Sequence, residues 1–111
     1  FYVVYSDNTI SGGFILVEND QLSWPEKLND SSFYFHKFVI KNNYCGKGYS
    51  DEIINWVKNY GKKMNKKYIR LDYDGNRKPI TALYTRNGFI PVDTISNEHV
   101  SKLIKAEYII N

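Results

Sequence analysis

Hydrophobic and polar positions follow two different periods along the chain. Runs rich in β-branched and aromatic residues predict strands, and the first four lie at residues 1–5, 10–17, 33–40 and 68–73. Between the third and fourth runs, apolar residues instead recur every three or four positions, which predicts an amphipathic helix that includes residues 51–60. The apolar stripe expected on that helix is formed by Tyr49, Ile53, Trp56, Val57, Tyr60 and Met64.

The second half of the chain predicts one more helix and two more strands. Pro79 suits the first turn of a helix, because its missing N–H is not needed there, and this helix is expected over residues 79–86. Asn87 and Gly88 are expected to end it in the left-handed conformation. The remaining strands are predicted at residues 89–95 and 107–110, with a short helix or loop between them.

The order of these elements predicts an α+β fold with one crossover of the α/β kind. Hairpins join antiparallel strands and a strand-helix-strand crossover joins parallel ones, so we expect a mixed, mostly antiparallel sheet flanked by helices. Gly12 and Gly13 predict a bulge or a close backbone approach, and Pro91 predicts an edge strand or a bulge. Residues 1–111 are expected to form a single domain whose native start lies upstream of Phe1.

Net charge and cysteine content bear on the binding partners and the cellular location of the protein. The formal net charge is +3, and four lysines gather within residues 62–67. Because these lysines follow a predicted helix, where cations suit the negative end of the dipole, binding to nucleic acid is the weaker interpretation. A single cysteine, Cys45, allows no internal disulfide, and no run is apolar and long enough for a membrane helix. The expected location is the cytoplasm, with no membrane partner.

A glycine loop at residues 45–50, Cys-Gly-Lys-Gly-Tyr-Ser, joins the third strand to the first helix. Glycine lets the backbone approach an anion and adopt positive φ, and the amides at a helix start point outward. The loop therefore predicts a phosphate site, with Ser50 as the helix cap. Asp51 and Glu52 in the first turn weaken the local field for an anion, and the backbone amides and Lys47 must outweigh them.

Three segments then carry a family resemblance. The strand end Phe38-Val39-Ile40 with the glycine loop is similar to an Arg/Gln-x-x-Gly-x-Gly/Ala pyrophosphate loop. Residues 71–76 resemble the fourth-strand exit and helix start of the same family, and residues 84–89, Tyr-Thr-Arg-Asn-Gly-Phe, match its Tyr-x-x-x-Gly-Phe signature. In this order the segments resemble the GNAT acyltransferases, which move an acyl group from acyl-coenzyme A to an amine.

This resemblance implies an N-acetyltransferase that uses acetyl-CoA as cosubstrate, needs no metal, and has a first strand and two helices before Phe1. A small-molecule or peptide amine attacks the thioester directly, and Tyr84 protonates the departing thiolate as general acid; a homodimer is left open. Without the resemblance, Tyr84 is interpreted as a core aromatic packed against Phe89. The implied acetyl-CoA-binding residues are Phe38, Val39, Ile40, Cys45, Gly46, Lys47, Gly48, Tyr49, Ser50 and Asn76.

Two questions stay open at this point. The base that deprotonates the amine is Glu26, His36, Asp72 or a water chain, and an imidazole suits proton transfer at neutral pH. Cys45 stands where the family prefers Arg or Gln, and Ser50 where it prefers Gly or Ala. These departures favour an alternative in which a catalytically inactive domain of the same fold binds CoA or a protein partner.

Overall fold

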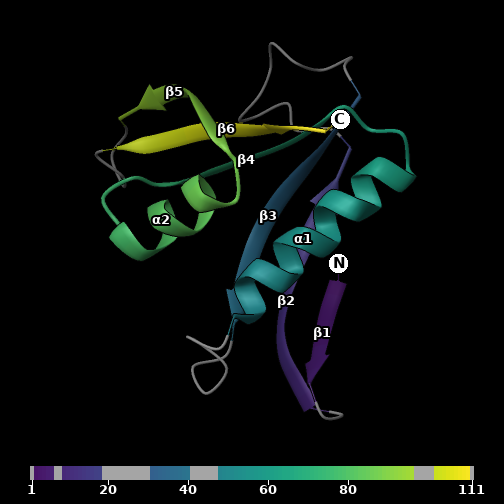
Figure 1. Cartoon of the computed structure of the whole chain (residues 1–111). Coiled ribbons are helices and arrows are strands. Elements are labelled where there is room, and N and C mark those ends of the chain that lie inside the picture. Colours follow the sequence, from purple (N-terminus) through teal and green to yellow (C-terminus); the bar gives the residue numbers. More distant parts are fainter. Residues whose placement is uncertain (1, 7–8, 19–30, 41–47, 97–101, 111) are drawn as a thin grey trace.

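The computed structural model describes residues 2–6, 9–18, 31–40, 48–96 and 102–110, which form six strands and two helices (Figure 1). The strands are β1 (Tyr2–Ser6), β2 (Thr9–Val17), β3 (Ser32–Ile40), β4 (Tyr68–Asp74), β5 (Ile90–Ile95) and β6 (Leu103–Ile109). The helices are α1 (Tyr49–Lys63) and α2 (Lys78–Arg86).

The strands form one sheet in the order β1-β2-β3-β4-β6-β5. The β3–β4 pair, joined through α1, is parallel, and the other four neighbouring pairs are antiparallel. The predicted element order and the mixed, mostly antiparallel sheet are therefore confirmed. β5 lies at one edge of the sheet, as Pro91 predicted, because proline cannot donate to a second neighbouring strand.

The bulge predicted at the glycine pair is present between β2 and β3. Gly13 pairs with Val39, whereas Ile15 pairs with His36, so β3 holds one residue more than β2 over this interval. A Cβ atom at Gly12 would collide with the Val39 carbonyl oxygen, so this position needs glycine for the close approach of the two backbones. The extra residue bends β3 just before its carboxyl end.

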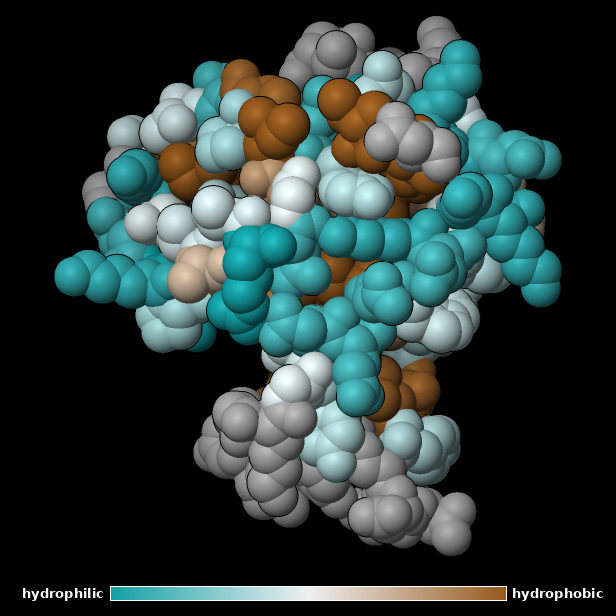
Figure 2. Space-filling view, viewed as in Figure 1, coloured by the Kyte–Doolittle hydropathy of each residue, from teal (hydrophilic) through white to brown (hydrophobic). Residues whose placement is uncertain are grey.

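The core lies between one face of the sheet and both helices. Alternate residues of β4, Ile69, Leu71 and Tyr73, pack in one cluster with Val57 of α1 and Leu83 of α2. Both helices therefore cover the same face of the sheet (Figure 1). Hydrophilic side chains predominate on the outer surface of these helices, as expected for amphipathic segments (Figure 2).

The buried stripe of α1 differs from the predicted one. Trp56 and Met64 are each 46% exposed, whereas Ile54 and Gly61 are buried. The buried positions still recur at helical spacing but are rotated around the helix, because the sheet selects the branched Ile54 and the small Gly61 for its contact surface. The periodicity correctly predicted the helix, but it wrongly placed Trp56 and Met64 on the buried face.

Two predicted helix ends are also corrected. α1 begins at Tyr49 after Gly48, which has φ 81°, so Ser50 is the second helical residue and not the cap. At the end of α2, Gly88 is left-handed with φ 85°, but Asn87 has φ −91°. In both places a glycine takes the left-handed conformation, because it has no Cβ to clash.

The opposite face of the sheet carries a polar network around Arg70, whose side chain is 1% exposed. Its Nη1 donates to Ser32 Oγ at 2.7 Å and to Tyr34 Oη at 3.3 Å, both on β3. Its Nε donates to Glu107 Oε2 on β6 at 3.0 Å, and the guanidinium lies 4.5 Å from the Tyr68 ring centroid. One side chain of β4 thus ties together both neighbouring strands.

The lysine cluster has structural contacts in this fold. Lys62 and Lys63 lie in the last turn of α1, where positive charge suits the helix dipole. Lys66 forms an ion pair with Glu18 at 2.7 Å and lies 5.1 Å from the centroid of the Phe33 ring.

Neither helix in the described ranges is long and apolar enough to cross a membrane.

Candidate functional site

The seam between β3 and β4 opens toward the carboxyl ends of the two strands. Pairing is limited to three residue pairs, from Ser32–Tyr68 to Tyr34–Arg70, although the strands continue to Ile40 and Asp74. Beyond the third pair, the described parts of the two strands no longer pair with each other. The carboxyl ends of β3 and β4 are therefore not joined to each other by a ladder of hydrogen bonds, and the β3 end lies beside its bulge.

The predicted pantetheine-binding segment forms the end of β3 at this opening. Val39 and Ile40 pair with Gly13 and Gly12 on the β2 side, while β4 does not pair with them. The ring of Phe38 packs on that of Phe35 at 5.2 Å, and Val39 is exposed. The structure thus places Phe38, Val39 and Ile40 at the open seam.

The start of α1 follows this strand in the chain. Gly48 is the N-cap residue, and the first helical hydrogen bond runs from the Glu52 N–H to the Gly48 carbonyl. The amides of residues 49–51 therefore precede the helical ladder and point out of the helix end. Gly48, Tyr49 and Ser50 lie here as predicted, whereas Cys45, Gly46 and Lys47 lie outside the described residues.

Tyr84 is held on α2 with its ring among aromatic neighbours. The side chain is 4% exposed, and its ring centroid lies 5.1 Å from that of Tyr73 at the end of β4 and 5.6 Å from that of Phe89. Burial, with a smaller contribution from the charge of Asp72, raises the pKa of Tyr84 to about 12. The phenol therefore keeps its proton at neutral pH. Among the described residues, no hydrogen bond joins its hydroxyl to another side chain or to the backbone.

The other predicted residues lie at varied distances from this point. Asn76 is exposed in the turn after β4, where its N–H donates to Asp74 Oδ1 at 3.0 Å. Asp72 is half-buried on β4 and close enough to act electrostatically on Tyr84. His36 is half-buried on β3, next to the bulge. Glu26, the third candidate base, lies outside the described residues.

An ion pair that the sequence did not predict joins the two helices. Arg86, at the end of α2, donates from Nε and Nη2 to the two carboxylate oxygens of Asp51 at 3.0 and 2.8 Å. Asn87 Nδ2 donates to Asp51 Oδ1 at 2.9 Å and to the Leu83 carbonyl at 2.8 Å. The Arg86 hydrogen bonds, followed by that of Asn87, lower the pKa of Asp51 to about 2. The start of α1 is thus tied to the helix that carries Tyr84.

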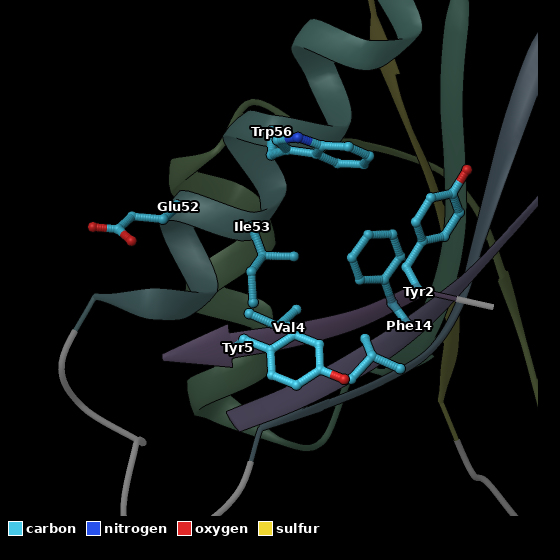
Figure 3. A pocket seen from close by; sticks show the side chains of 8 residues that line it. Tyr2, Val4, Tyr5, Phe14, Glu52, Ile53 and Trp56 are labelled. Carbon is cyan, nitrogen blue, oxygen red and sulfur yellow. The ribbon is translucent and has the colours of Figure 1, made fainter. Parts of the chain in front are cut away.

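A separate apolar pocket of about 400 Å³ lies between α1 and the β1–β2 hairpin (Figure 3). The rings of Tyr2 and Phe14 stack at 5.0 Å on one wall, and Trp56 lies across from them. The Glu52 side chain points away from the cavity (Figure 3). None of the predicted site residues lines this pocket, so it is distinct from the opening between β3 and β4.

Sequence reasoning missed three features of the site region. Two of them are the buried contact of Arg70 with Glu107 and the ion pair of Asp51 with Arg86. In each, the two residues are more than thirty positions apart, and the local sequence pattern does not predict such partners. The position of Tyr73 beside Tyr84 was open to inference, because the inward-facing residues of the fourth strand alternate and Tyr73 is the last of them. No cluster of acidic, histidine or cysteine side chains suited to a metal ion occurs within the described part of the chain.

Comparison with known proteins adds information on the fold alone. No protein-family model and no curated protein sequence matches the chain. Among solved structures, the ribosomal-protein-S18-alanine N-acetyltransferase from Escherichia coli matches with a TM-score of 0.80 and 12% identity, over 96% of this chain and 66% of that enzyme.

A spermidine N-acetyltransferase of Vibrio cholerae matches with a TM-score of 0.78 and 19% identity, over 96% of this chain and 63% of that protein. A GNAT-family acetyltransferase from Listeria monocytogenes matches with a TM-score of 0.74 and 19% identity, over 91% of this chain and 58% of that protein. This chain thus spans about two thirds or less of the length of these neighbours. The described part of the chain has the GNAT acetyltransferase fold.

Proposed function

We propose that this chain belongs to an acyl-CoA-dependent N-acetyltransferase that transfers an acetyl group from acetyl-CoA to a primary amine. One observation carries the proposal: the buried Tyr84 of α2 lies beside Tyr73 at the end of β4, where the β3–β4 seam has parted, and the same helix binds the first turn of α1 through Arg86 and Asp51. The likeness of the fold to several acetyltransferases supports it.

Acetyl-CoA is proposed to lie across the open seam. The pantetheine arm would pair with the backbone of Phe38, Val39 and Ile40, as an added strand does at an exposed edge. The pyrophosphate would accept hydrogen bonds from the amides at the start of α1, including those of Gly48, Tyr49 and Ser50. Cys45, Gly46, Lys47 and Asn76 complete the proposed binding set.

In the proposed reaction, the neutral amine nitrogen attacks the thioester carbonyl carbon, the carbon–sulfur bond breaks, coenzyme A leaves as a thiolate, and the nitrogen loses a proton to a base as the amide forms. A backbone N–H near the end of β3 would stabilise the oxyanion. Tyr84 would donate to the departing sulfur. With its pKa raised to about 12, the phenol is fully protonated at neutral pH and available as a donor.

The high pKa also limits what Tyr84 can do. An alkyl thiol in water ionises near 8.5, so complete proton transfer from a phenol with a pKa of about 12 would be uphill there. Burial of the thiolate raises its proton affinity as well, since desolvation disfavours both anions. The proposed role is therefore a hydrogen bond that strengthens as charge develops on sulfur, with the proton following as the thiolate leaves.

The acceptor amine must lose a proton before attack. An amine like that of lysine is neutral in only about one molecule in two thousand at pH 7, so a base is needed. Asp72 and His36 both lie on strands that border the seam, and Glu26 is the third candidate. The solved neighbours named for spermidine and for the alanine of a ribosomal protein suggest polyamines and peptide α-amines as the first acceptors to try.

The proposal is tested by titrating the protein with coenzyme A in a calorimeter, and by following thiol release from acetyl-CoA with a panel of amines. The panel includes spermidine and a peptide with a free alanine N-terminus. Binding together with amine-dependent thiol release is expected. Absence of binding would refute the assignment, and binding without thiol release would favour the inactive CoA-binding alternative.

A further inference from the structure

The first turn of α1 contains two acidic residues, Asp51 and Glu52, at the end where an anion is proposed to bind. A carboxylate in the first turn is favourable for the helix itself, but it lowers the positive potential that an anionic ligand would meet. A phosphate site and an acidic first turn are therefore in conflict. At Asp51, the structure shows the negative charge paired with Arg86.

The carboxylate of Asp51 is engaged on both oxygens. Arg86 donates to Oδ1 and Oδ2 at 3.0 and 2.8 Å, and Asn87 Nδ2 adds a third hydrogen bond to Oδ1 at 2.9 Å. This two-pronged geometry uses the planar fork of the guanidinium, which a lysine cannot reproduce. The negative charge at this position is thus opposed by a fixed positive charge supplied from the other helix.

Asn87 has a second contact with α1. The Lys58 ammonium donates to the Asn87 carbonyl and lies 4.2 Å from the centroid of the Tyr108 ring. Two side chains of α1, those of Asp51 and Lys58, therefore bind the end of α2. The residue pair Arg86-Asn87 lies between Tyr84 and Gly88 of the signature segment, so the same segment supplies the phenol and the countercharge.

We propose that Arg86 is a positioning residue for the acyl-CoA site: by neutralising Asp51, it keeps the start of α1 attractive to the pyrophosphate of coenzyme A. This inference rests on the proposed function. Stability alone is a weak explanation for the pair, because both side chains are about half exposed and exposed ion pairs contribute little to folding. Its proposed effect is therefore on a charged ligand that binds beside it.

The test compares the affinity for coenzyme A, by calorimetry at low salt, of the wild-type protein, Arg86→Gln, Asp51→Asn and the double variant. Arg86→Gln exposes an uncompensated carboxylate at the helix start, and its dissociation constant is expected to rise roughly two- to five-fold. The double variant has neither charge and is expected to bind like the wild type. The defect of Arg86→Gln should shrink as salt is added.

Two further variants separate charge from structure. Lys63→Gln removes one positive charge from the far end of α1, about 20 Å away along the helix, and is expected to leave the affinity unchanged. Arg86→Lys keeps the charge without the fork and should retain most of the affinity. Thermal unfolding of each variant shows whether it is folded.

The possible failures have different meanings. If wild-type protein binds coenzyme A and Arg86→Gln binds it equally well, the positioning role is refuted while the proposed function stands. If the double variant binds as weakly as Arg86→Gln, Arg86 acts by some means other than neutralising Asp51, which also refutes the inference. If the wild-type protein does not bind coenzyme A, the proposed function and this inference fall together.

Discussion

The paired half and the open half of the β3–β4 seam differ in whether their buried polar groups have hydrogen-bond partners among the described residues. In the paired half, Arg70 is 1% exposed and its hydrogen bonds reach Ser32, Tyr34 and Glu107 on the flanking strands. In the open half, the strands part and the buried phenol of Tyr84 has no hydrogen-bond partner among the described residues. Both halves bury a polar group, but only the first satisfies it within the described fold.

We interpret the Arg70 network as structural and propose that the Tyr84 phenol serves the reaction. A buried donor without a partner costs stability, and where one occurs a bound water, a ligand or a role in a reaction can account for it. A satisfied buried ion pair is costly to break, because removing one partner leaves the other without its countercharge. Substitutions in the two halves should therefore affect different measurements.

The largest effect on stability is expected for Arg70→Met. This change removes the donor shared by three side chains and leaves the Glu107 carboxylate, which is 18% exposed, without the Arg70 guanidinium. The free energy of unfolding should fall by about 3–5 kcal/mol, measured by denaturant unfolding. Adding Glu107→Met should recover part of the loss. Arg77→Met, at an exposed position, is the control. An equal loss of stability in both variants would show that the buried contacts of Arg70 do not stabilise the fold.

Tyr84→Phe is the matching test in the open half. Turnover with acetyl-CoA should fall by roughly 10²- to 10⁴-fold, while the affinity for coenzyme A stays unchanged, because the phenol is proposed to act as the bond to sulfur breaks. The free energy of unfolding should stay the same or rise slightly, since the hydroxyl is buried without a described partner. Tyr5→Phe, at an exposed position on the edge strand β1, serves as the control. Normal turnover in Tyr84→Phe would remove this residue from the mechanism.

The smallest effect is expected for the Asp51–Arg86 ion pair between the helices, as a dependence of stability on pH. Folding lowers the pKa of Asp51 from 3.8 to about 2, so its contribution to stability is complete above pH 3.8 and disappears as the pH falls toward 2. Thermal unfolding between pH 5 and pH 2 should therefore show a smaller loss for Asp51→Asn than for the wild type, by no more than a few degrees because the pair is exposed. Identical pH profiles would contradict this.

Much of the fold and part of the site followed from local patterns. The runs of β-branched residues located the strands, Gly12 and Gly13 marked a real bulge, and Pro91 marked a real edge strand. The roles assigned to Tyr84 and to the loop before α1 remain predictions, and the first part of that loop lies outside the described residues. The errors concern Trp56 and Met64, which are exposed, the caps at Ser50 and Asn87, and residues 103–105, which were expected in a short helix or loop but begin β6.

The sequence by itself determined which segments are strands and helices, because those preferences depend on neighbours within a few positions. Only the tertiary structure decided how far β3 and β4 stay paired, that Arg70 is buried, and that Arg86 meets Asp51. Each of these depends on residues more than thirty positions apart, which come together only after the sheet has formed. Local periodicity carries no information about such partners, and the chemistry proposed here depends on them.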